Sequence, residues 1–186
     1  MVVGIYPALI GNPSVGKSGV KANENLPICY KGTVFLSYNN PDLDVAKKLK
    51  KLLQAEGIRS IWFDKDNLGA GEHEILIKKE IRSCKVFIPL ISNHSLSASA
   101  DSFVKKVEWE SIKIRFNYNE LNRDEIEEGD RFQLIPVVLD NTDRSDSRIP
   151  AFMQKFSMWN YPQDRERIVE VIQNALISFK RDNRSV

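Results

Sequence analysis

The chain has 186 residues, of which 42% are hydrophobic and 28% charged, with a net charge of +2. These values fit one globular domain with a sizeable core, and the charge is too small and too evenly mixed to predict nucleic-acid binding. No apolar run approaches the roughly 18 residues of a membrane span, and the N-terminus lacks the charged region of a secretory signal. The two cysteines and two histidines are too few and too scattered to predict a disulfide framework or a metal site, so we expect a cytoplasmic, metal-free protein.

The first 31 residues differ in composition from the rest. They are rich in Gly, Pro, Asn and Ser and contain no long periodic segment. We interpret residues 1–31 as a leader or linker, such as the remnant of a preceding domain, residues 32–181 as the folded domain, and residues 182–186 as a tail.

One segment of this leader, residues 11–18, matches the phosphate-binding pattern G-x-x-x-x-G-K-[ST]. A working P-loop needs a strand before it and a helix after it, because the helix N-terminus holds the phosphates. Gly4 and Pro7 weaken the strand, and residues 19–27 make a poor helix. We therefore favour a chance match over a nucleotidase, which would lose all activity on Lys17→Ala.

From residue 33 onward, short apolar runs alternate with segments of helical periodicity. The expected strands span residues 33–38, 59–64, 85–92, 132–140 and 156–161. The expected helices span residues 42–56, 74–84, 103–118, 149–156 and 164–179, with a loop at 65–73 and an acidic insertion at 119–130. This alternation predicts a flavodoxin-like α/β fold, a five-stranded parallel sheet of order 2-1-3-4-5 with helices on both faces. Pro89 is unusual in a strand of that central position.

Such a sheet has its ligand crevice at the carboxyl ends of the first and third strands, where the strand order reverses. The crevice would be lined by residues 37–40 and 92–94, and the helix at 103–118 that carries Glu108 follows the second of these loops. Exposed glutamates are common on helices, and Glu110 and Glu120 compete with Glu108 for a functional role. The position of Glu108 beside the crevice, next to Trp109, favours it.

Two other classes of protein with this fold do not match the sequence. A receiver domain needs acidic residues after the first strand and a phosphorylatable Asp after the third, but these positions hold residues 37–40 (SYNN) and 92–93 (SN). A flavodoxin needs a hydroxyl- and Gly-rich phosphate loop after the first strand, and that loop is missing from the sequence.

Four segments together resemble the Toll/interleukin-1 receptor (TIR) domain family, in the order that the family has them. Residues 34–38 (VFLSY) resemble its first strand, 57–71 its second strand and BB loop, and 86–96 its third strand. Residues 105–109 (KKVEW) resemble the Glu-Trp segment of bacterial members. The resemblance covers about residues 33–180 and implies cleavage of NAD+ at the nicotinamide–ribose bond.

The resemblance also implies residue roles, with Glu108 as the catalytic glutamate. The family often has an aromatic residue four positions earlier, where this chain has Val104, with Phe103 next to it. Residues expected to line the NAD+ site are Ser37, Tyr38, Asp64, Phe103 and Trp109. Residues expected in a gating or assembly loop are Asn67, Leu68, Gly69 and Gly71.

The implied partners are NAD+ as a substrate rather than a cofactor, further copies of the chain, and a sensor domain or protein. Neither nucleic acid nor membrane is expected as a direct partner. The implied role is bacterial antiphage immunity, as a hydrolase or as an ADP-ribosyl cyclase, which need the same glutamate. The alternative is an adaptor that acts only by TIR–TIR association. An adaptor would tolerate Glu108→Gln but lose function when the loop at Leu68 is disrupted.

Overall fold

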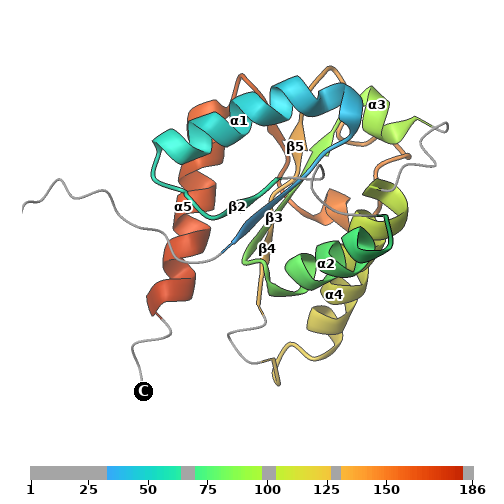
Figure 1. The fold of residues 1–186 in the computed structure, drawn as a ribbon, viewed down its shortest axis with the longest axis vertical. Coiled ribbons are helices and arrows are strands. Elements are labelled where there is room, and N and C mark those ends of the chain that lie inside the picture. Colours follow the sequence, from blue (N-terminus) through green and yellow to red (C-terminus); the bar gives the residue numbers. More distant parts are fainter. Residues whose placement is uncertain (1–32, 64–69, 98–103, 127–130, 182–186) are drawn as a thin grey trace, which may run out of the picture.

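The computed structural model of the chain describes residues 33–63, 70–97, 104–126 and 131–181 (Figure 1). The leader, its P-loop-like segment, most of the BB-like loop, Phe103 and the tail lie outside these ranges.

The described strands form one parallel sheet in the order β2-β1-β3-β5-β6, with β4 also pairing to β3. This confirms the predicted flavodoxin-like order, with the predicted fourth strand present as two short segments. The strands are β1 (Val34–Ser37), β2 (Ile61–Trp62), β3 (Val86–Ile91), β4 (Gln133–Leu134), β5 (Val137–Val138) and β6 (Trp159–Asn160).

Pro89 lies in the central strand β3 at the point where the neighbouring strand is interrupted. The carbonyls of Phe87 and Ile91 accept hydrogen bonds from Ile135 and Leu139, at 3.0 and 2.8 Å. Backbone groups alternate in direction along a strand, so the nitrogen of Pro89 faces the same side, at the gap between β4 and β5. A proline is tolerated there because no regular ladder bond is required at the break.

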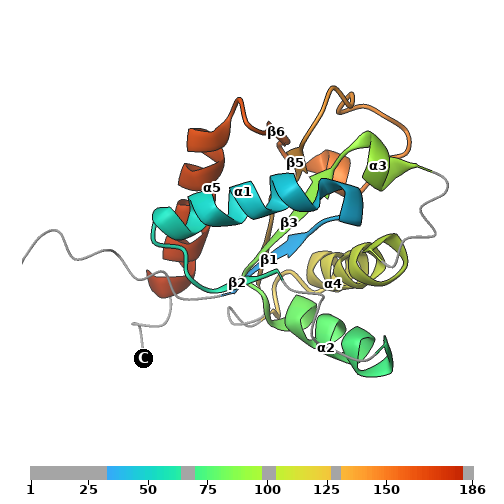
Figure 2. The same cartoon turned by 45° about the horizontal axis from the view of Figure 1, so that its top comes forward.

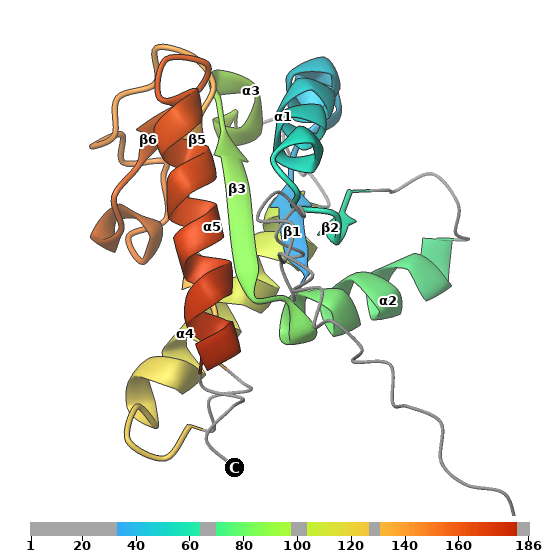
Figure 3. The same cartoon turned by 90° about the vertical axis from the view of Figure 1, so that its left-hand side faces the viewer.

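Helices cover both faces of the sheet (Figure 1, Figure 3). One face packs against α1 (Leu43–Ala55) and α5 (Arg165–Arg181), and the other against α2 (Ala70–Ser83) and α4 (Glu110–Leu121). Successive side chains along a strand point to opposite faces of the sheet, so neighbouring residues belong to different cores. Phe35 and Phe87 stack at 5.2 Å between ring centroids in the α2/α4 core, while Val34 and Leu36 belong to the α1/α5 core.

Short helical elements connect the strands and the longer helices. The 3-10 turn η1 (Asn40–Asp42) connects β1 to α1, and α3 (Asn93–Leu96) follows β3. Figure 2 shows α3 directly after the arrowhead of β3, close to the start of α1. The π-helical segment η2 (Val104–Trp109) runs directly into α4, and the 3-10 turn η4 (Met153–Lys155) precedes β6.

The structure corrects several predicted boundaries. The second and fifth predicted strands are only two residues long, as β2 and β6, and each pairs with one neighbour at an edge of the sheet. The predicted helix at 149–156 is reduced to η4, which begins after Pro150. Helix α2 begins at Ala70, so Gly71 belongs to its first turn rather than to the predicted loop at 65–73.

Candidate active site

Two of the expected site residues, Ser37 and Trp109, are in contact at the carboxyl end of β1. The indole Nε1 of Trp109 donates a hydrogen bond to Ser37 Oγ over 3.3 Å, and the residues are 3% and 0% exposed. A buried indole N–H needs an acceptor, and Ser37 supplies it. Ser37 pairs with Pro89 of β3, so the contact lies at the switch point that the sequence predicts.

Glu108 directly precedes Trp109 within the π-helical segment η2. A π turn contains one more residue than an α turn, and such turns occur frequently at functional sites. Val107, Glu108 and Trp109 are 8%, 0% and 3% exposed, so three consecutive side chains face the protein interior. The segment therefore carries a carboxylate into the interior beside the residue that contacts the end of β1.

The two competing glutamates of this helix lie in solvent. Glu110 forms an ion pair with Lys113 at 3.3 Å, and Glu120 forms one with Arg123 at 2.8 Å, in both cases with partly exposed side chains. Surface pairs at this spacing are ordinary features of a solvated helix face. A buried acid is instead a candidate for a functional role, and burial therefore favours Glu108 among the three.

Tyr38 lies in the other core, apart from this cluster. It is 4% exposed, its ring stacks on Phe63 at 4.8 Å, and its hydroxyl donates to the Phe63 carbonyl at 3.2 Å. Its ring belongs to the α1/α5 core, whereas Trp109 belongs to the α2/α4 core. The structure therefore does not bring the ring of Tyr38 together with Trp109.

The remaining expected site residues cannot be placed together with this cluster. Asp64, Asn67, Leu68, Gly69 and Phe103 lie outside the described residues. Their expected roles stay predictions.

A polar network joins the loops after β3 and β5. Both the backbone N–H and the side-chain amide of Asn93 donate to Asp140 Oδ2, at 2.8 and 3.1 Å, and Thr142 donates to the other oxygen. Partial burial alone would raise the pKa of Asp140, but these hydrogen bonds from Asn93 and Thr142 outweigh burial and lower it. Arg148 donates to Asn93 Oδ1 at 3.0 Å and extends the network.

A second polar contact joins the loops after β1 and β3. The hydroxyl of Ser92 donates to Asp42 Oδ2 at 2.7 Å, and the two residues are 1% and 5% exposed. Burial raises the pKa of Asp42, and the hydrogen bond from Ser92 only partly offsets this. Neither Asp42 nor Asp140 was predicted as a site residue, although Asp42 begins the predicted helix at 42–56 and Asp140 ends the predicted strand at 132–140.

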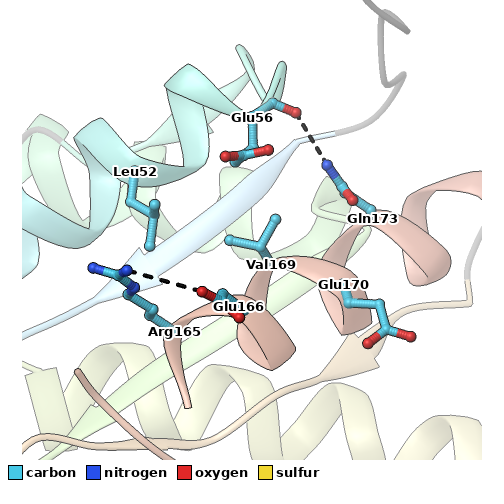
Figure 4. Close-up of a pocket in the computed structure, with 7 residues that line it drawn as sticks. All are labelled: Leu52, Glu56, Arg165, Glu166, Val169, Glu170 and Gln173. Atoms are coloured by element: carbon cyan, nitrogen blue, oxygen red, sulfur yellow. Dashed lines mark hydrogen bonds and ion pairs between the residues drawn. The ribbon is translucent and has the colours of Figure 1, made fainter. Parts of the chain in front are cut away.

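Two of the hollows in the described surface that have the size of small-ligand pockets lie on opposite faces of the sheet. One, of about 450 Å³, is lined by Trp109, Glu110, Lys113 and Arg148 among others, and Glu108 is not among the residues that line it. The other, of about 490 Å³, lies between α1 and α5 and includes Glu56, Glu166, Glu170 and Gln173 (Figure 4). Because α1 and α5 cover the opposite face from Trp109, the hollow of Figure 4 is separate from the candidate site.

Cys84 has no features of a nucleophile. It is fully buried, and burial raises the pKa of its thiol to about 11, with only partial opposition from Arg115. The reactive form of a cysteine is the thiolate, which this environment disfavours. In the part of the chain that the structure describes, no helix combines the length and apolar character that crossing a membrane requires.

Comparison with protein families decides the classification. The TIR domain family model matches residues 34–171, which is most of the chain. The chain belongs to the TIR domain family. No curated protein matches the chain in sequence.

Solved structures agree with the TIR fold. A metazoan TIR-STING receptor from C. gigas in complex with 2',3'-cGAMP superimposes with a TM-score of 0.56 at 18% identity over 80% of this chain. A second structure of the C. gigas receptor gives 0.55 at 18% identity over 79%. The match spans 41% and 42% of those longer chains, and at this identity it supports the fold alone. The bacterial subclass that residues 105–109 suggest stays a prediction.

Proposed function

We propose that this TIR domain cleaves NAD+ at the nicotinamide–ribose bond, with Glu108 as the catalytic glutamate. The observation that carries the proposal is the buried carboxylate of Glu108 on the π-helical segment, next to Trp109, whose indole contacts Ser37 at the switch point of the sheet. Membership of the TIR family supports the same reaction, because the family includes NAD+-cleaving members.

The proposed reaction needs only one acidic group. The bond between C1′ of the ribose and the pyridinium nitrogen breaks, and its electron pair leaves with nicotinamide, which departs as a neutral molecule. The ribose carbon gains oxocarbenium character, as in glycoside cleavage. A carboxylate near the ribose stabilises this charge more strongly in the transition state than in the ground state. No general acid is required, because the leaving group needs no proton.

The acceptor decides the product. Water attacks C1′ and loses a proton, which gives ADP-ribose. Attack by an adenine nitrogen or a ribose hydroxyl of the same molecule gives a cyclic isomer. Both routes use Glu108 in the same step, so the proposal covers a hydrolase and a cyclase.

Biologically, we place this activity in antiphage defence, downstream of a sensor domain or protein. Copies of the domain would associate through TIR–TIR contacts, and the loop that contains Leu68 and Gly69 would take part in them. Substrate access requires movement, because Glu108 is 0% exposed in the single chain. Association of copies is a natural cause of such a movement.

The same burial favours the second candidate function, an adaptor that binds other TIR domains without catalysis. An adaptor has no need for access to Glu108, and the carboxylate would then be a purely internal group. The two functions differ in whether NAD+ is consumed.

The test is incubation of the purified full chain with NAD+ over a range of protein concentrations, with and without a crowding agent. Products are resolved by chromatography and mass spectrometry. We expect nicotinamide release with a specific activity that rises with protein concentration, and the co-product identifies hydrolase or cyclase. No release at any concentration would reject catalysis and favour the adaptor.

A further inference from the structure

Asp42 is a buried carboxylate that the proposed reaction does not use. It comes from η1 after β1, and its partner Ser92 comes from the end of β3, 50 residues later in the sequence. Their oxygen atoms are 2.7 Å apart, which is the usual distance for a hydroxyl hydrogen bond, and both residues are at most 5% exposed. The contact therefore spans the switch point, away from bulk solvent.

The hydroxyl of Ser92 has a fixed orientation. Its single proton is donated to Asp42, and its oxygen accepts from the backbone N–H of Ser95 at 3.0 Å, which caps α3. In return, Ser95 Oγ accepts from the backbone N–H of Ser92 at 2.9 Å. Asp42 thus extends the capping box of α3, and linked hydrogen bonds of this kind reinforce one another.

A second bond joins the same two loops. The side-chain amide of Asn39 donates to the carbonyl of His94 in α3, at 3.4 Å. The residues between Ser37 and Asp42 are therefore attached to α3 at two points, while Trp109 contacts Ser37 from the α4 side. These contacts together fix the end of β1 from both sides of the switch point.

A buried carboxylate lowers stability unless its partners offset the loss of hydration. Burial is the largest influence on the pKa of Asp42 and raises it. The carboxylate of Asp42 therefore adds little to the stability of the fold. Holding the two loops in one arrangement is a role that explains its presence.

We propose that Asp42 and Ser92 form a latch that holds the loop after β1 against α3 and so sets the shape of the NAD+ crevice. Asp42 is a positioning residue in this account, and its role in catalysis rests on the proposed function. The latch itself is a property of the fold and can be tested without turnover.

The first test measures amide hydrogen exchange in the full chain. Asp42→Ala should speed exchange at Ser95 and Leu96, whose amides donate to Ser92 and begin α3. Asp44→Ala is the matched control, because Asp44 is an exposed acid in the first turn of α1. Equal exchange in wild type and Asp42→Ala would overturn the latch, whether or not the protein cleaves NAD+.

The second test compares steady-state kinetics with NAD+. We expect Asp42→Ala and Ser92→Ala each to lower kcat/KM about tenfold, mainly through KM, because the latch shapes the walls of the crevice. The double variant should be no worse than the worse single variant. Asp42→Asn should recover most of the loss, because its amide oxygen still accepts the Ser92 hydroxyl.

Three kinetic results would contradict this role. Additive losses in the double variant would show that the two residues act separately. A loss in Asp42→Asn equal to that in Asp42→Ala would show that the charge itself matters, as for a group that touches substrate. Unchanged kinetic constants in all variants would show that the latch has no role in catalysis. If the wild type does not cleave NAD+, the proposed function fails, and the exchange data alone decide the latch.

Discussion

The two helical layers of this TIR domain differ in regularity. On one face, α5 is a continuous helix of 17 residues whose buried residues Ile168, Ile172 and Leu176 recur every four positions. On the other face, α4 continues from a π-helical turn that buries a carboxylate and an indole side by side. A helix that only covers the sheet follows the ordinary α-helical period, whereas the helix with the candidate catalytic residue departs from it. Such departures from regular helix geometry occur frequently at functional sites.

The largest expected effect on stability is in the regular layer. Ile172 is 0% exposed in the core between α5 and the sheet, and Ile172→Ala should lower the free energy of unfolding by about 2–5 kcal/mol. NAD+ cleavage per folded molecule should stay the same. Urea unfolding combined with turnover measured below the transition checks both. A loss of turnover in molecules that remain folded would mean that the two layers are coupled.

A smaller effect is expected from the bond that links the irregular layer to β1. Trp109→Phe keeps most of the apolar contact but removes the donor to Ser37, which should lower stability by about 1 kcal/mol. We expect NAD+ turnover per folded molecule to fall as well, because the end of β1 contacts the residue next to Glu108. Ser37→Ala removes the acceptor of the same hydrogen bond, so the double variant should lose no more stability than the worse single variant. Full additivity would show that the bond contributes nothing.

The smallest expected effect is a pH dependence from Asp42. Its folded-state pKa is raised above the ordinary value of 3.8, so the folded state binds the proton more tightly than the unfolded state does. The associated stability is fully present below pH 3.8 and is lost as pH rises through the folded pKa. Asp42→Asn removes this titration, so the variant should gain stability relative to wild type as pH rises from 3 to 7. Thermal unfolding of both proteins across that range measures the difference in their stability. A variant that loses stability relative to wild type as pH rises would contradict the raised pKa of Asp42.

Much of this fold follows from sequence pattern alone. The helix predicted at 164–179 is present as Arg165–Arg181, because its apolar residues recur strictly on one face. The strand predicted at 132–140 is broken at Ile135 and Pro136, because proline cannot donate to the ladder. The helix predicted at 149–156 failed because an apolar pattern over so few residues does not distinguish a helix from a buried turn.

The site was predictable only in part. Ser37 and Trp109 were named from their positions, and they meet because the strand order places the end of β1 beside η2. The π turn has no local sequence signal, since its register depends on how Glu108 and Trp109 pack against the sheet. The burial of Asp42 was missed because it depends on Ser92, which is distant in the sequence.

The most direct test of the account compares two glutamates of the same helix. Glu108→Gln and Glu120→Gln each replace a carboxyl group by an amide of nearly the same shape, but Glu108 is buried and Glu120 is exposed and paired with Arg123. Nicotinamide release from NAD+ should be abolished in Glu108→Gln and unchanged in Glu120→Gln, with both variants as stable as the wild type or more so. Equal release by Glu108→Gln and the wild type would contradict the assignment of Glu108 as the catalytic residue.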